Sequence, residues 1–394
     1  MTYAKRAGWG IAATLLLAGG AACSSMQDAE AFSRGPDDDR NGREPGAENV
    51  DNAPGTGDPG APAATGVVLV HSAAFPAFRL CFENSLNLRP LPDSKAMPQA
   101  NVVGAEIGSL VRLAPLDAPG KVFVIRESAV RASAGDPSGP SCEELLGDGA
   151  SALLSSDYHV ANVAGSPEGI TQPLGKDRVQ VLAITGCGSQ VFTSFLKVDS
   201  ASCGADWSPT TGNLVANVID LPTTATGATD STIPVQLVHL APSLEAQLGT
   251  AKLEVSFGEL ATPGKLPTEV ASETALLKSS EQVALPVDQN ADATYGTHGF
   301  RIVAREGNGS AKFSLDQSLA AVQSSSAPRE VPKTYYRVAS NYALLLLGDP
   351  SVPATLDGGA PNTDRRRVQL LAVPVLDPAT RDAGAGAGDE DGGG

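Results

Sequence analysis

Short apolar runs alternate with turn-forming residues along most of this chain. Two of the runs are nearly the same, because Val67–Ala73 reads VVLVHSA and Val235–Ala241 reads VQLVHLA. A run of apolar and β-branched positions that closes on a His, with Pro a few residues later, is typical of a strand followed by a turn. We therefore expect two copies of one β-rich domain, with His71 and His239 at equivalent strand ends.

Three further pairs of similar segments keep the same order in the two copies. Collinear matches of this kind rarely arise by chance, so the pattern indicates a tandem duplication. Their spacings differ between the copies, as expected where surface loops on a shared scaffold differ in length. The pairs are Val124–Glu127 with Val303–Glu306, Tyr158–Asn162 with Tyr336–Ser340, and Arg178–Ile184 with Arg367–Val373.

The polar pattern within the runs supports strands that are buried on one face. Phe78, Leu80 and Phe82 alternate with polar or small residues, which suits a half-buried antiparallel strand. The chain also contains 42 Gly and 29 Pro, a composition that favours short strands joined by many turns. We predict an all-β protein made of two tandem Ig-like antiparallel β-sandwich domains.

Composition divides the chain into segments of different kinds. Between the copies, Phe192–Val198 and Leu214–Ile219 are expected to form an extra hairpin on the first domain. Helix is expected only in short pieces, such as one turn at Glu143–Leu146 and a short helix that opens at Ser314. The predicted organisation is a signal peptide over 1–22, a disordered tether over 23–65, β-sandwich domain 1 over 66–220, a linker over 221–232, β-sandwich domain 2 over 233–376 and a disordered acidic tail over 377–394.

The N-terminus has the features of an export signal. Lys5 and Arg6 precede an apolar stretch that is too short to span a bilayer, and small residues lead into Cys23. This segment resembles a bacterial lipoprotein signal, in which the Cys is acylated and becomes the mature N-terminus, although Gly20 stands where that pattern prefers Leu. The resemblance implies a lipid anchor on Cys23, and Ser24 after it fits the outer membrane of a Gram-negative bacterium. Ordinary cleavage after Ala22, which would release a secreted protein, is the alternative.

Four cysteines remain once Cys23 is assigned to the lipid. An even number in an exported chain predicts two disulfides, with three possible connectivities. We favour Cys187–Cys203, which would close the predicted hairpin, and Cys81–Cys142, which would join a strand to a loop. No Cys-x-x-Cys spacing or nearby His supports zinc as the alternative.

The chemistry-bearing residues do not match an enzyme motif. The sequence lacks the nucleophile-elbow, zincin, Walker and dinucleotide motifs, so we predict a protein without catalytic activity, cofactor or metal. A secreted hydrolase with an unrecognised site is the alternative, and it would need a cleft that joins His159 or His298 to a Ser and a carboxylate. Asp288–Asp292 spaces oxygen donors like a calcium loop, but Ala293 stands where that loop needs Gly, which favours a plain polar loop.

Charge narrows the choice of partners. The net charge is −16, and no basic stripe with interleaved aromatic residues occurs, so nucleic acid is not an expected partner. The one basic run, Arg365–Arg367, is interpreted as a solvated strand entrance.

The repeated start resembles a known family. The VQLVHLAP segment, the following strand Leu253–Phe257 and a later Tyr-rich strand are similar to a bacterial envelope domain of unknown function, whose tandem repeats begin with V-R-V-V-H-A-S-P-like segments. The resemblance covers about 66–184 and 234–375. It implies Ig-like sandwiches with a surface role and supplies no catalytic residues. The sequence thus predicts an exported cell-envelope lipoprotein, attached to the membrane by its lipid, that binds an envelope protein or glycan or serves as a structural module.

Overall fold

A computed structural model gives the structure of this chain. It describes the following residues: 63–92, 107–108, 110–132, 140–147, 153–154, 156–193, 198, 203–224, 231–248, 252–287, 296–306, 308–322, 336, 341–356 and 362–376.

Strands are the main regular structure among the described residues and the helices are few and short, so the prediction of an all-β protein is confirmed. The elements of the first half are β1 (Gly66–Ala74), β2 (Phe78–Phe82), β3 (Leu110–Leu113), β4 (Val122–Arg126), α1 (Glu127–Ala132), α2 (Cys142–Leu146), β5 (Tyr158–Val163), β6 (Val179–Cys187), α3 (Gln190–Thr193) and β7 (Val215–Leu221). Those of the second half are β8 (Thr232–His239), α5 (Pro242–Leu248), β9 (Lys252–Glu259), β10 (Thr268–Ser272), β11 (Val283–Pro286), β12 (His298–Arg305), β13 (Ala311–Ser318), β14 (Asn341–Leu347) and β15 (Gln369–Val375).

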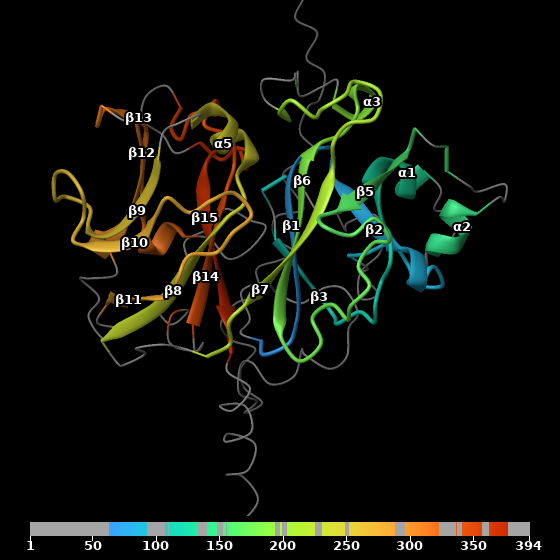
Figure 1. Cartoon of the computed structure of the whole chain (residues 1–394), viewed down its shortest axis with the longest axis horizontal. Helices are drawn as coiled ribbons and strands as arrows, with labels where there is room; N and C mark the ends of the chain where they lie inside the picture. Colours follow the sequence, from blue (N-terminus) through green and yellow to red (C-terminus); the bar gives the residue numbers. More distant parts are fainter. Residues whose placement is uncertain are drawn as a thin grey trace, which may run out of the picture. The chain divides into compact units, whose positions relative to one another are not determined.

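Figure 1 shows the strands of both halves, whose sheets differ in size but share some strand pairings. In the first half, one sheet has the order β2-β4-β5-β7-β6-β1-β3; in the second, two sheets have the orders β11-β8-β14-β15 and β10-β9-β12-β13. The first strand of each half lies between an antiparallel short strand and a parallel partner, because β1 pairs with β3 and β6 while β8 pairs with β11 and β14. Likewise, β4 lies between β2 and β5, and β12 lies between β9 and β13.

This arrangement does not confirm the Ig-like antiparallel sandwiches that the sequence led us to expect. In an Ig constant-type domain the first two strands share a sheet, whereas β8 and β9 lie in different sheets. The pairs β1–β6, β8–β14 and β5–β7 are also parallel. The two sheets that contain these pairs are therefore mixed, whereas the sheet β10-β9-β12-β13 is antiparallel throughout.

Two of the four sequence matches join segments that do not correspond. Tyr158–Asn162 lies in β5, which pairs with β4 as β13 pairs with β12, whereas Tyr336 lies in no strand and 337–340 lie outside the described residues. The other match concerns the parallel strands. Arg178–Ile184 includes most of β6, which is the parallel partner of β1, whereas Arg367–Val373 includes most of β15. The parallel partner of β8 is β14, so β14 corresponds to β6, and β15 corresponds to β7. The mismatch has a physical cause. Both β14 and β15 are buried along their whole length, so both read as continuous apolar runs.

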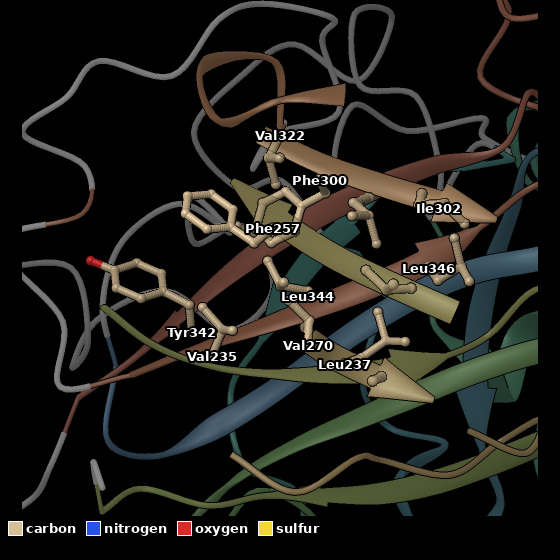
Figure 2. Packing of buried hydrophobic residues seen from close by; sticks show 14 of the residues in the cluster. Val235, Leu237, Phe257, Val270, Phe300, Ile302, Val322, Tyr342, Leu344 and Leu346 are labelled. Carbon is tan, nitrogen blue, oxygen red and sulfur yellow. The ribbon is translucent and has the colours of Figure 1, made fainter. Parts of the chain in front are cut away.

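Three clusters of buried apolar side chains explain these runs. One lies inside the first half and includes Leu69 and Phe78. A second lies inside the second half, where Phe257, Phe300 and Leu344 pack between the sheets (Figure 2). The third draws on both halves; it contains Val68, Val70, Leu110, Val179, Val181, Ala183, Leu221, Val238, Leu240, Ala343, Leu345, Leu347, Leu371, Val373 and Val375. We call this third cluster the shared core.

The shared core ties the two halves together. The described residues belong to one compact unit that is not divided at the predicted linker, 221–232. Beside that linker, Asn341 Nδ2 donates a hydrogen bond of 2.5 Å to the carbonyl oxygen of Pro222. At the end of the predicted tether, Ala63 and Ala64 are buried, and the amide of Leu376 donates to the carbonyl oxygen of Ala63 at 3.0 Å. The signal peptide, the rest of the tether and the acidic tail lie outside the described residues.

The material between the copies differs from the predicted hairpin. Phe192 lies in helix α3 instead of a strand, and β7 is a full member of the sheet, paired with β6 from Val179 to Thr185. The helix predicted to open at Ser314 is also wrong, because β13 continues to Ser318. The single turn near Glu143–Leu146 is confirmed as α2, which Ser141 caps together with Glu144.

Candidate functional site

A cavity of about 150 Å³ lies where the ends of β1 and β14 meet. Its walls come from the end of β1, the turn at Ile107–Gly108, the start of α5, the stretch that follows β14, and Arg365–Arg366. Both halves therefore contribute to the cavity. Its volume equals that of a cavity known to accept benzene, so it suits a molecule of roughly six to ten non-hydrogen atoms.

A close approach of two backbones builds one wall of the cavity. The amide of Gly108 donates a hydrogen bond of 2.8 Å to the carbonyl oxygen of His71, and the φ of Gly108 is +69°. A Cβ at this position would lie only 2.2 Å from the carbonyl oxygen of Arg365. Only glycine meets both demands, so this residue fixes how the two halves meet.

The polar groups of the cavity come from both halves. The hydroxyl of Ser72 donates to the carbonyl oxygen of Leu240. Asp349 Oδ1 accepts hydrogen bonds from Gln247 Nε2 at 3.0 Å and from the amide of Ser351 at 2.8 Å. The cavity thus has an anchored carboxylate on one wall.

A cation lies on the neighbouring wall. Arg366 Nε and Nη2 hold the carboxylate of Asp364, with 2.6 Å between Nη2 and Oδ2. The guanidinium lowers the pKa of Asp364, and that carboxylate in turn raises the pKa of Arg366, to which the charge of Asp349 adds. The amide of Asp349 donates to the carbonyl oxygen of Arg366 at 2.7 Å, which keeps the two charged residues adjacent.

The two repeat histidines occupy equivalent positions in the strand register. His71 pairs with Ile184 on the parallel strand β6, and His239 pairs with Leu346 on the parallel strand β14. Both rings are fully buried. His239 is the last residue of β8, whereas β1 runs three residues beyond His71 and so does not end there.

Only His71 lines the cavity. Its ring packs on Phe78 with 4.4 Å between the centroids. The Nδ1 atom of His239 lies 3.2 Å from the carbonyl oxygen of Thr274, and burial lowers the pKa of this imidazole against the opposing effects of that carbonyl and of Glu245. The geometry assigns both residues to the packed interior, His71 within β1 and His239 at the end of β8.

The two remaining histidines lie away from this cavity. His159 lies on β5, and burial lowers its pKa; His298 Nδ1 lies 3.0 Å from Thr297 Oγ1, and its ring lies 5.9 Å from that of Phe257. Neither side chain lines the cavity. Cys23 and the Asp288–Asp292 loop lie outside the described residues.

The structure contains both disulfides that the sequence predicts. Cys81 is bonded to Cys142, and Cys187 is bonded to Cys203. Two disulfides indicate an extracytoplasmic protein. The second closes a loop that includes Val198, which lines the cavity. The side chain of Asn213 links the two cysteines, because it accepts a hydrogen bond from the amide of Cys187 and donates one to the carbonyl oxygen of Cys203.

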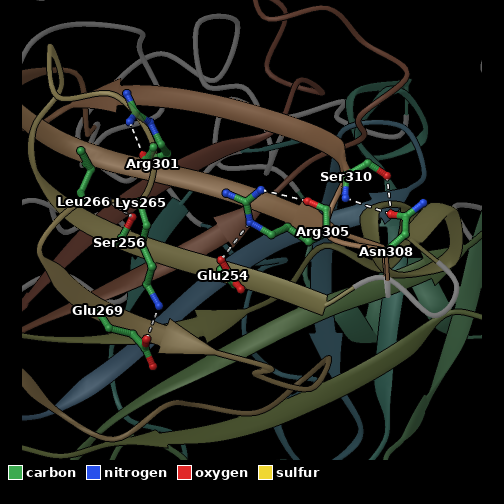
Figure 3. A network of polar contacts seen from close by, with 11 residues as sticks. Glu254, Ser256, Lys265, Leu266, Glu269, Arg301, Arg305, Asn308 and Ser310 are labelled. Atoms are coloured by element: carbon green, nitrogen blue, oxygen red, sulfur yellow. Dashed lines mark hydrogen bonds and ion pairs between the residues drawn. The ribbon is translucent and has the colours of Figure 1, made fainter.

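The charged outer face of the second half offers no comparable site. Arg301 pairs with Asp316. Figure 3 shows the pairs of Arg305 with Glu254 and of Lys265 with Glu269. Each of these cations has an acidic neighbour on the same sheet. Among the residues that the structure describes, no group of three or more His, Cys, Asp or Glu side chains is arranged to hold a metal ion. In the same part of the chain, no helix has the length and apolar character needed to cross a membrane.

The sequence did not reveal the cavity. Its residues come from six separate segments, and only the tertiary structure brings them together. Arg365–Arg367 does precede a strand, β15, as expected, but Arg366 lines the cavity and Arg367 Nε donates to the carbonyl oxygen of Asn362 at 2.7 Å. One local feature could have pointed to the cavity. Gly348 and Asp349 directly follow the apolar run Leu344–Leu347, as expected where a strand ends in a turn.

Comparisons with known proteins add little. No protein-family model matches the chain, and no curated protein matches it. A crystal structure described as that of a "putative adhesin" from Bacteroides ovatus covers 78% of this chain and 95% of its own, with 12% sequence identity and a TM-score of 0.18. A likeness at that TM-score carries no argument about the fold or the activity of this chain.

Proposed function

We propose that this chain is an exported cell-envelope lipoprotein whose β body is a non-enzymatic binding or structural module. The lipid on Cys23 attaches it to a membrane, the outer membrane of a Gram-negative bacterium, and the loops of the body bind an envelope protein or glycan. The export signal and the two disulfides support this address.

The observation that carries the proposal is that the chain enters the body at one end while the cavity lies at the opposite end. Ala63, where the chain enters from the tether, bridges Val375 at the start of β1 and the end of β15. The cavity lies at the opposite ends of these strands, beside Ala74 and Arg366. Since β1 has nine residues, the two ends are about 25–30 Å apart. A tether at one end and a polar cavity at the other suit a module displayed on a surface.

Mass spectrometry of the mature protein from the membrane fraction tests the anchor. We expect an N-terminal peptide that begins at Cys23 and carries acyl chains, and we expect Cys23→Ala to abolish the acylation. An unmodified peptide that begins at or near Cys23 would show a secreted protein instead. Binding is tested by capture from envelope extracts on the full body, with the tether alone as the control. Recovery of nothing above that control would contradict the binding role.

A further inference from the structure

We infer that the cavity at the ends of β1 and β14 is a binding site for a small zwitterion, an α-amino acid with a short aliphatic side chain. This goes beyond the protein or glycan binding proposed above, because it adds a small-molecule site at the end of the body opposite Ala63.

The charged residues among the described lining of the cavity are Asp349, Arg365 and Arg366, and two of them indicate the ligand class. Asp349 Oδ1 already accepts two hydrogen bonds, whereas its Oδ2 accepts none from the described residues. Arg366 uses Nε and Nη2 to hold Asp364, and Nη1 donates no hydrogen bond to a described residue. An ammonium group at Asp349 and a carboxylate at Arg366 would satisfy both atoms through charge-assisted hydrogen bonds. A ligand of one charge would satisfy only one of them.

The size and the apolar part of the cavity define the side chain. Valine has eight non-hydrogen atoms, which fits a volume of about 150 Å³. Val198, Val352 and Ile107 supply apolar surface beside the charged groups. No Phe, Tyr or Trp lines the cavity, so the stacking surface that a sugar ring or an aromatic ligand would use is missing from its described walls.

The disulfide Cys187–Cys203 completes the site. It joins Cys187 and Cys203, which lie on either side of Val198 in the sequence, and Asn213 forms hydrogen bonds with both cysteines. The second disulfide, Cys81–Cys142, belongs to a separate apolar cluster with Ile125 and Leu145 and contributes no residue to the cavity. Occupancy therefore depends on one disulfide and not on the other.

Isothermal titration calorimetry of the purified exported protein tests the ligand class. L-Valine should bind, and both N-acetyl-L-valine, which lacks the ammonium, and L-valinamide, which lacks the carboxylate, should bind about 10- to 100-fold more weakly. Equal binding of all three compounds, or no binding of valine, would overturn the inference. Binding of D-glucose without binding of valine would also overturn it, yet would leave the binding role of the module standing.

Two variants locate the site. Asp349→Asn keeps an acceptor for Gln247 and Ser351 and should weaken valine about tenfold or more, while leaving N-acetyl-L-valine unchanged. Asp316→Asn, on the remote outer face with Arg301, is the matched control and should leave valine binding unchanged. The pair Cys187→Ser and Cys203→Ser should weaken valine, whereas Cys81→Ser with Cys142→Ser should not. Equal effects of Asp349→Asn and Asp316→Asn would contradict the assignment. The ligand analogues decide the question even where a variant fails to fold.

Discussion

The hydroxyl of Ser72 donates a hydrogen bond to the carbonyl oxygen of Leu240, 168 residues further along the chain. Ser72 lies near the end of β1, and Leu240 follows β8, so the bond joins the equivalent first strands of the two halves. Leu240 also belongs to the shared core, together with Val70. The two halves are therefore packed against each other through buried apolar side chains of both.

The first prediction concerns this shared core. Leu345 lies in β14 of the second half and is fully buried against residues of the first. Leu345→Ala should lower the free energy of unfolding by about 2–5 kcal/mol. Because the halves share the cluster, the fluorescence of Trp207 in the first half should report the lower midpoint in denaturant. An unchanged Trp207 transition would show that the halves unfold separately.

The second prediction concerns the glycine at the contact between the halves. Gly108→Ala places a Cβ in the left-handed region and 2.2 Å from the carbonyl oxygen of Arg365. Gly165→Ala is the matched control, because its φ is +76° and no atom lies within 4 Å of the added Cβ. The control should cost about 1–2 kcal/mol of unfolding free energy, and Gly108→Ala should cost clearly more. Equal costs in thermal melts would mean that the halves do not approach closely at Gly108.

The third prediction concerns a side chain that covers a strand edge. Gln317 Nε2 donates to the carbonyl oxygen of Leu370, and its Oε1 accepts from the amide of the same residue, each at 2.9 Å. Gln317→Leu should cost about 1–3 kcal/mol for each backbone group left without a partner. Gln247→Leu, which removes one exposed bond to Asp349, should change stability by about 0.5 kcal/mol or less. Equal values for both variants in chemical denaturation would refute this role.

The fourth prediction is a pH dependence from His239. Its pKa lies below the ordinary value because the ring is buried, so the unfolded chain binds the proton more readily. The stability that neutral His239 contributes is fully present above the unfolded-state pKa of about 6.5 and is lost as the pH falls below it. We expect the unfolding free energy to decrease from pH 7 to pH 5, and less steeply in His239→Asn.

His159 must be measured separately, because burial lowers its pKa as well and its effect has the same sign. His159→Asn gives its share of the slope. A pH profile that is identical in His239→Asn and in the parent protein would contradict the assignment to His239.

The fifth prediction concerns the disulfides. Loop closure over 16 residues at Cys187–Cys203 and over 61 residues at Cys81–Cys142 corresponds to about 3 and about 4 kcal/mol of stability in the chain-entropy account. Each pair of Ser variants should therefore lower the melting temperature of the protein. Reduction of both disulfides in the parent protein should lower it by the sum of the two effects. Variants that melt like the oxidised parent would contradict this account.

Much of the architecture could be predicted from local patterns. Strand alternation gave the all-β class, and the even cysteine count with its spacing gave Cys81–Cys142 and Cys187–Cys203. The echo around His71 and His239 matched residues that hold the same register against β6 and β14. These features depend on residues close in sequence or on simple counting.

The features that could not be predicted from the sequence depend on contacts between segments far apart in the chain. Burial on both faces makes β14 and β15 alike, so similarity to Arg178–Ile184 could not tell which of them corresponds to β6. Phe192 was assigned to a strand, but the turn into α3 is set by Ser189, whose carbonyl accepts from the amide of Phe192. The cavity is assembled by tertiary packing of both halves, so Asp349 and Arg366 had no common signature in the sequence.

Hydrogen exchange with mass spectrometry along a denaturant series tests most directly whether the chain forms one body with a shared core. Peptides from β1 and β6 report on the first half, and peptides from β14 and β15 report on the second. A shared core predicts that all four lose protection at one midpoint, and that Leu345→Ala shifts all four together. Separate midpoints for the two halves, with only β14 and β15 shifted by the substitution, would contradict it.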